Sequence, residues 1–226
     1  MKTRAPYHDV DFLGGLTNIG EQMSQTFLLA SASPRRADIL RGLGLTFDVW
    51  APQVDEAVYE GESVDEYLLR VVESKLLAAA DAADETKRFV LVADTAVVLD
   101  GDILGKPTSR EHAARMLEGL AARTHHVLTR FAVAELAGGG HHGASRRLER
   151  IIADTVATVV TFRSLTPNQI EAYIATGEPM DKAGAYGIQG KAACFVRRIE
   201  GSYSNVVGLP ACEVAEALEL LGVLPL

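Results

Sequence analysis

The sequence predicts an α/β fold, because strand-like and helix-like segments alternate along the chain. Residues 27–30 are apolar and strand-like, residues 34–43 follow a helical pattern, and residues 47–51 are strand-like again. The chain has 226 residues, of which 48% are hydrophobic and 23% charged, an ordinary globular composition. A chain of this length can bury about 70% of its unfolded surface without help from a disulfide or a metal.

The next segment is a long helix that we expect to run from Ser63 to about residue 80. Ser63 and Glu66 have the spacing of a capping box, in which each side chain accepts a hydrogen bond from the other residue's backbone. Tyr67, Val71 and Lys75 then recur at helical spacing, which places Lys75 on a largely apolar stripe. A lysine on such a stripe either serves a site or extends its amine to solvent, and the pattern leaves both readings open.

The segment at 89–93 is a short apolar run typical of a strand that is covered on both faces. We expect it to stop at Asp94 and Thr95, and the strand pattern to resume at 97–99. A carboxylate and a hydroxyl would then lie at the carboxyl end of a strand, where α/β sheets bind their ligands. The alternative is an aspartate that caps a turn.

The remaining elements follow from caps and apolar runs. Thr108 and Glu111 have capping-box spacing for a helix to about residue 120, and residues 127–136 and 151–162 read as long strands. Between those strands, residues 137–150 contain three consecutive glycines and read as a mobile surface insertion. A capped helix is expected over 166–175 and a last helix over 210–221.

Charge and composition indicate which partners and which cellular compartment the protein can have. The net charge of −8 disfavours non-selective binding to nucleic acid or anionic lipid. We expect residues 1–25 to form a loosely ordered extension, and we find no apolar stretch of membrane-spanning length, so we expect a cytoplasmic protein. Two cysteines, Cys194 and Cys212, fit a reducing compartment, and we expect buried, inert thiols.

The first candidate site is the junction between the strand at 27–30 and the following helix. Ser31 and Ser33 precede the helix, and Arg35 and Arg36 occupy its first turn, where cations are disfavoured by the helix dipole. Hydroxyls, guanidiniums and free backbone N–H groups at this point would bind phosphate oxygens. The alternative is a pair of solvated arginines.

Further candidates lie in later segments. Asp94 could bind Mg²⁺ or accept a proton from water, and Lys106 lies in a constrained Leu-Gly-Lys-Pro segment. Gln189, in a glycine-bearing segment at 178–190, can read the edge of a base, although the segment could also be a simple turn.

These segments together resemble the Maf family of nucleoside triphosphate pyrophosphatases, once described as septum-formation inhibitors. The resemblance covers about residues 26–223 and rests on motifs in order: LASASPRR (29–36), ADT (93–95), LGKP (104–107), and DKAGAYGIQG (181–190) followed by GSYSNVVGLP (201–210). Residues 1–25 and 137–150 lie outside the pattern. The form of the 181–190 motif is similar to the subgroup that acts on dTTP and UTP rather than on 7-methyl-GTP.

The resemblance implies an extended mixed sheet flanked by helices, two lobes around a deep nucleotide cleft, and a homodimer. It also implies hydrolysis of a nucleoside triphosphate to the monophosphate and pyrophosphate with a divalent metal, Mg²⁺ or Mn²⁺. Position by position, it makes Asp94 the proton acceptor. Glu56 matches a further pocket position, where it is either a metal partner of Asp94 or a solvated surface acid. It assigns substrate choice to Arg35, Thr95 and Gln189, and the remaining pocket positions to Ser31, Ser33, Arg36, Lys75 and Lys106.

Four alternatives accompany this interpretation. The enzyme could act on modified nucleotides as a house-cleaning pyrophosphatase, or the protein could be a nucleotide-binding regulator of division that acts through a protein partner. A pure binder needs the cations but not Asp94. Two histidine pairs, at 125–126 and 141–142, could suggest zinc, but adjacent histidines on a strand face opposite sides. A nucleic-acid-binding module is disfavoured by the acidic net charge.

Overall fold

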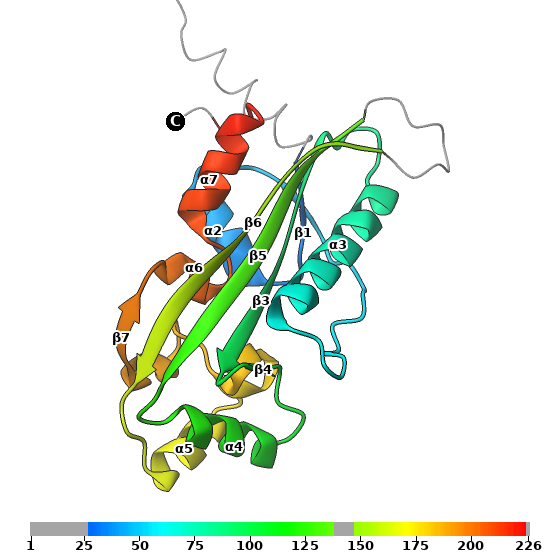
Figure 1. The fold of residues 1–226 in the computed structure, drawn as a ribbon. Coiled ribbons are helices and arrows are strands. Elements are labelled where there is room, and N and C mark those ends of the chain that lie inside the picture. The colour runs from blue at the N-terminus through cyan, green and yellow to red at the C-terminus, as the bar shows by residue number, and fades with distance from the viewer. Residues whose placement is uncertain (1–26, 138–146, 225–226) are drawn as a thin grey trace, which may run out of the picture.

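The computed structural model describes residues 27–137 and 147–224, and within them one mixed seven-stranded sheet carries the fold (Figure 1). The strands are β1 (Phe27–Ala30), β2 (Asp48–Trp50), β3 (Phe89–Leu99), β4 (Asp102–Leu104), β5 (Thr124–Leu136), β6 (Leu148–Phe162) and β7 (Val196–Glu200). Their order is β2-β1-β3-β5-β6-β7, with β4 paired to β3. β1 runs parallel to β2 and β3, and the other pairs are antiparallel. The expected α/β fold with a mixed sheet is confirmed.

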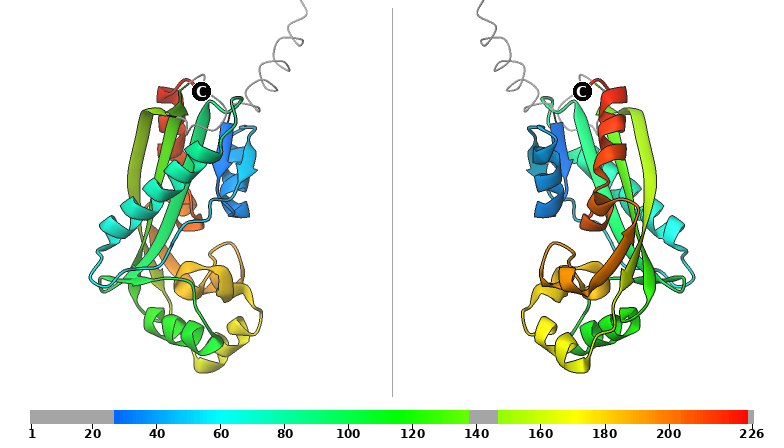
Figure 2. Two further views of the ribbon diagram at one scale, coloured as in Figure 1. Left: turned by 90° about the vertical axis from the view of Figure 1, so that its right-hand side faces the viewer. Right: turned by 90° about the vertical axis from the view of Figure 1, so that its left-hand side faces the viewer.

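Helices cover both faces of the sheet (Figure 2). They are α2 (Pro34–Gly42), α3 (Val64–Ala82), α4 (Arg110–Leu120), α5 (Pro167–Ile174), α6 (Tyr203–Val207) and α7 (Ala211–Leu220), with 3-10 turns at Glu178–Asp181, Ala183–Ala185 and Lys191–Phe195. None of the helices in the described ranges is long and apolar enough to cross a membrane.

Successive side chains of the central strands point to opposite faces of the sheet, and each face is covered by different helices. Leu29 and Leu91 point to the face covered by α2 and α7, whereas Leu28 and Val90 point to the opposite face, covered by α3. Because both faces are covered, the run at 89–93 is apolar at every position, as the sequence predicted. A third cluster joins α4 and α5 to the far ends of β3, β5 and β6.

The expected end of the strand at Asp94 is wrong, since β3 continues through this residue to Leu99. Asp94 and Thr95 stay in the ladder with β5, opposite Arg130 and Thr129. The other neighbour, β1, pairs with β3 only as far as Leu91. Asp94 therefore lies in mid-strand, just beyond the carboxyl end of β1, and it is the end of β1 that leaves room for a ligand.

Helix starts agree with the sequence at two of the three caps that it predicts. Ser63 and Thr166 form complete boxes with Glu66 and Gln169. The third is displaced by one residue: Ser109, not Thr108, caps α4 and accepts from the backbone N–H of His112. Two adjacent hydroxyl residues precede α4, so spacing alone did not separate them.

Two other expectations need correction. Both cysteines are exposed rather than buried, because Cys194 lies in a surface 3-10 turn and Cys212 on the outward side of the first turn of α7. The expected insertion is shorter than 137–150, because Ala137 N donates to Arg147 O and β6 begins at Leu148. The N-terminal extension and the rest of the insertion lie outside the described residues.

Candidate active site

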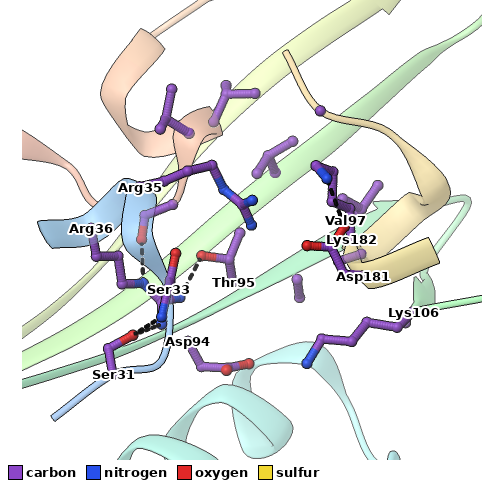
Figure 3. Close-up of a pocket in the computed structure, with 18 of the residues that line it drawn as sticks. Ser31, Ser33, Arg35, Arg36, Asp94, Thr95, Val97, Lys106, Asp181 and Lys182 are labelled. Carbon is purple, nitrogen blue, oxygen red and sulfur yellow. Dashed lines mark hydrogen bonds and ion pairs between the residues drawn. The ribbon is translucent and has the colours of Figure 1, made fainter. Parts of the chain in front are cut away.

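A cleft of about 890 Å³ opens where β1 ends, within the size range of small-ligand sites. Figure 3 shows the side chains that converge on it. The structure brings to this one cleft every candidate named from the sequence: Ser31, Ser33, Arg35, Arg36, Glu56, Lys75, Asp94, Thr95, Lys106 and Gln189.

The start of α2 forms one wall of the cleft. Ser33 is the N-cap residue, yet its side chain makes no capping hydrogen bond, and Pro34 follows in the first turn. Ser31 Oγ accepts from the backbone N–H of Ser33 at 3.2 Å. The first turn carries no acidic side chain, so the helix start offers hydrogen-bond donors to an anion.

The two arginines of α2 have different environments. Arg36 is buried and donates to Gly208 O at 2.8 Å, Ser31 Oγ at 3.1 Å and Thr95 Oγ1 at 3.2 Å. Burial lowers the pKa of Arg36, while the charges of nearby carboxylates oppose this shift. The alternative of a solvated pair is therefore wrong for Arg36. Arg35 makes no hydrogen bond to any described residue, and its guanidinium extends into the cleft (Figure 3).

Lys75 joins the two carboxylates of the site. Its Nζ lies 2.7 Å from Asp94 Oδ1 and 2.6 Å from Glu56 Oε1, and only 6% of its side chain is exposed. The reading in which this lysine extends to solvent is wrong, because its amine is held beneath the cleft by two anionic partners.

Glu56 also contacts Lys106, whose Nζ lies 3.1 Å from Oε2. Partial burial raises the pKa of Glu56, but hydrogen bonds and charges from Lys75 and Lys106 outweigh it and bring the pKa to about 2. Glu56 is thus an ionised member of the cleft rather than a solvated surface acid.

Tyr67 is a site residue that sequence reasoning missed. Its hydroxyl donates to Asp94 Oδ2 at 3.3 Å, and burial together with the negative charges of Asp94 and Glu56 raises its pKa. Its position is the signal, because Tyr67 precedes Lys75 on the same helical stripe. The pattern alone assigns Tyr67 to the apolar face of the helix.

The opposite wall is the segment that contains Gln189. The Gln189 side chain is exposed and makes no hydrogen bond within the described part of the chain. Lys182 Nζ donates to Asp181 Oδ1 at 2.6 Å and to Glu178 O at 2.8 Å, and all three residues line the cleft. These three belong to a segment that the sequence singled out, but they received no role there.

A series of buried hydrogen bonds holds the Thr95 side chain in place. Thr95 Oγ1 lies 2.9 Å from Thr129 Oγ1, which donates to Asn205 O at 3.1 Å. The Asn205 amide donates in turn to Thr158 Oγ1 and Val127 O. These bonds tie the segment around α6 to the sheet and fix the hydroxyl that faces Arg36.

The donor set fits a divalent cation that arrives with phosphate. Mg²⁺ is commonly held by one or two carboxylates together with substrate phosphates, and Glu56 and Asp94 provide two carboxylates that share Lys75. Among the described residues there is no group of three or more His, Cys, Asp or Glu side chains suited to a metal ion. His125 is buried against Tyr186, whereas residues 141–142 lie outside the described ranges.

Known proteins match this chain over nearly all of the described fold. The family model described as Maf-like protein matches residues 26–221, which include every site residue named above. A dTTP/UTP pyrophosphatase of Moorella thermoacetica is 50% identical over 196 residues, which cover 87% of this chain and 95% of the relative.

Two further relatives carry the same name. The dTTP/UTP pyrophosphatase of Geobacter metallireducens is 46% identical over 197 residues, covering 87% of this chain and 96% of the relative. That of Photorhabdus laumondii is 45% identical over 194 residues, covering 86% and 93%. With a family model matched from β1 to the end of α7 and relatives aligned over most of their own length, this chain belongs to the Maf family.

Proposed function

We propose that this protein is a nucleoside triphosphate pyrophosphatase that hydrolyses dTTP and UTP to the monophosphate and pyrophosphate. The observation that carries the proposal is the carboxylate of Asp94, held beneath a cleft that also presents Arg35, Lys75 and Lys106. The printed names of the relatives support the same activity and the same two substrates.

The cleft divides into a phosphate end and a base end. The start of α2, with Ser33 and Arg35, and the amine of Lys106 offer donors and positive charge to the triphosphate. Arg36 stays buried and holds Ser31 and Thr95 in place. Gln189, whose amide is not engaged by the described part of the protein, would contact the pyrimidine ring.

The chemical step is attack of water on the α-phosphorus with pyrophosphate as the leaving group. Asp94 accepts the proton of the attacking water, a role worth roughly 10²–10⁴-fold in rate. Lys75 and Tyr67 each hold one oxygen of this carboxylate and orient it. Negative charge grows on the leaving oxygen, and the cations of the cleft stabilise it by their position and field.

Glu56 and Asp94 are the residues that would hold the divalent cation, Mg²⁺ or Mn²⁺. When bound, such an ion supplies Lewis-acid polarisation of the phosphate oxygens. Lys75 and Lys106 hold the pKa of Glu56 at about 2, so this carboxylate is negatively charged at neutral pH and can bind a cation.

A nucleotide-binding regulator of division is the second candidate. Such a protein would need the cations of the cleft to bind a triphosphate, but it would not need a carboxylate placed to accept a proton from water. The position of Asp94 favours the enzyme for this reason. The two-lobed shape, a homodimer and a cytoplasmic location are further proposals, which rest on the family resemblance.

The test is pyrophosphate release from the common and 7-methylated triphosphates, with Mg²⁺ and then Mn²⁺, by the wild type and by Asp94→Asn. We expect release from dTTP and UTP by the wild type, and loss of most turnover in Asp94→Asn with nucleotide binding retained. Release that is equal in the two proteins would remove Asp94 from the chemistry. Tight binding without release from any nucleotide would favour the regulator.

A further inference from the structure

We propose that Arg70, which lies outside the cleft, is a positioning residue that sets the place of Glu56, an inference that rests on the proposed function. Arg70 is on α3, three residues after Tyr67, and does not line the cleft. Its side chain is 25% exposed. What links it to the site is the backbone on either side of Glu56.

The backbone carbonyls on either side of Glu56 accept hydrogen bonds from Arg70 of α3. Arg70 donates to Asp55 O at 3.2 Å and to Ala57 O at 2.7 Å, so one guanidinium binds both neighbours of Glu56. Tyr67 OH lies 3.4 Å from the carbonyl of Glu56 itself. The backbone that carries this carboxylate is therefore attached to the same helix that carries Lys75.

The guanidinium is in turn fixed by a second set of contacts. Glu62 accepts from Arg70 through both carboxylate oxygens, at 2.6 and 2.8 Å. The ring of Tyr59 lies against the other side, 3.9 Å from the guanidinium carbon to the ring centroid. A bidentate pair combined with stacking orients an arginine in a way that a lysine cannot reproduce.

This attachment matters because Glu56 lies in a connection without regular structure. Residues 51–63 join β2 to α3 with neither helix nor strand (Figure 1). On the cleft side, Glu56 is held by Lys75 and Lys106, and the amine of Lys106 is proposed to contact phosphates when substrate binds. Once Lys106 engages the substrate, the contacts of Arg70 are what keep the Glu56 backbone in place.

The test begins with Arg70→Gln and Arg70→Lys, measured by kcat/KM for pyrophosphate release. Because misplacing a reacting group by about 1 Å can cost roughly 10²-fold, we expect a fall of roughly 10- to 100-fold in both variants. Recovery of wild-type kcat/KM in Arg70→Lys would mean that charge alone matters, and would overturn the proposal.

Arg88 offers a matched control. It forms a pair with Glu135 through Nε and one terminal nitrogen, and its guanidinium lies over the ring of Phe89, away from the cleft. Arg88→Gln removes the same kinds of contact, and we expect its kcat/KM to stay within about twofold of the wild type. An equal loss in Arg88→Gln and Arg70→Gln would contradict a specific role for Arg70.

A double-mutant cycle with Glu56→Gln separates positioning from a general effect on stability. If Arg70 acts through Glu56, Arg70→Gln should lower kcat/KM no further in the Glu56→Gln background. Additive losses would overturn the inference. Glu62→Gln, which weakens the contact but keeps Arg70, should show a smaller loss with the same non-additivity, and it serves if Arg70→Gln does not fold.

A binding measurement separates failure of this inference from failure of the proposed function. Calorimetric titration with the non-hydrolysable α,β-imido analogue of UTP and Mg²⁺ should give roughly tenfold weaker binding to Arg70→Gln than to wild type and Arg88→Gln, as for loss of an outer-shell contact at a metal site. Unchanged binding in Arg70→Gln would count against its positioning of Glu56. If the wild type binds the analogue but releases no pyrophosphate, the proposed function is contradicted, whereas the positioning of Glu56 by Arg70 is not.

Discussion

Lys75 on α3 and Asp94 in the middle of β3 form an ion pair with 2.7 Å between Nζ and Oδ1. The pair crosses from a helix to the central strand of the sheet, and Glu56 adds a second carboxylate to the same amine. The Lys75 amine therefore separates two negative charges that would otherwise repel each other at the base of the cleft.

Replacing Lys75 by Met should cost both stability and activity. Removing one partner of a buried pair leaves the other charge uncompensated, so we expect Lys75→Met to lower the free energy of unfolding by about 3 kcal/mol. Pyrophosphate release should fall by about 10²-fold or more, because Asp94 loses the group that orients it. Urea unfolding and kcat measurements check the two effects separately.

Lys106→Met is the control for the stability effect. Its side chain is 60% exposed, and exposed pairs contribute less than about 1 kcal/mol, so the free energy of unfolding should change little. If the two lysine variants were equally destabilised, burial of the Lys75–Asp94 pair would not be the cause.

The sequence predicted most of the fold because caps and apolar periodicity are local signals. The helix starts at Ser63 and Thr166 can be predicted because each capping residue is followed, three positions later, by its capping-box partner. The continuation of β3 through Asp94 is different, because it depends on pairing with β5. The partner of Asp94 in that strand, Arg130, lies 36 residues further along the chain. A polar residue in mid-strand looks like a strand end until its partner strand is known.

Motifs in the sequence predicted which residues form the candidate site, but not which of them contact one another. Nothing local distinguishes Arg35 from Arg36, yet Gly208 and Thr95 bury only the second. Likewise Tyr67 looks like an apolar-stripe residue until the helix is placed over Asp94. Such roles depend on contacts between distant segments, which a single sequence does not reveal.

Gln189→Ala should change substrate choice more than rate. The side chain lines the cleft, is exposed, and bonds to nothing in the described ranges, so its removal should shift the free energy of unfolding by less than about 0.5 kcal/mol. We expect lower selectivity for dTTP and UTP over purine triphosphates, measured as ratios of kcat/KM across the panel. An unaltered selectivity profile would argue against contact between Gln189 and the base.

Gly184→Ala tests how tightly the 181–190 segment packs on β3. Gly184 has a φ of +65°, and a Cβ at this position would lie 2.8 Å from Val97 Cγ1. The backbone strain and the overpacking together should cost about 2 kcal/mol or more in the free energy of unfolding. Gly105→Ala is the matched control, because a Cβ there meets no described atom within 4 Å. Equal stability of the two variants would mean that the segment can move away from β3.

His125 should make stability depend on pH. Its Nε2 lies 2.9 Å from Tyr186 OH, its Nδ1 is buried without a partner among the described residues, and burial, aided by the charge of His126, lowers its pKa from 6.5 to about 4. The unfolded chain therefore takes up a proton that the folded protein resists between these two values. The contribution of His125 is complete above pH 6.5 and falls as the pH drops toward 4, by on the order of 3 kcal/mol.

The measurement is urea unfolding of the wild type and His125→Gln between pH 7 and pH 4.5. Glutamine has no proton to gain in this interval, so the difference in unfolding free energy between the two proteins should shift in favour of His125→Gln as the pH falls. His126→Gln, on the exposed side of the same strand, should change this dependence only slightly, because burial is the larger cause of the lowered pKa of His125. A constant difference between wild type and His125→Gln would show that His125 is protonated in the folded protein as readily as in the unfolded chain, and that the aromatic cluster around Tyr186 does not exclude its charge.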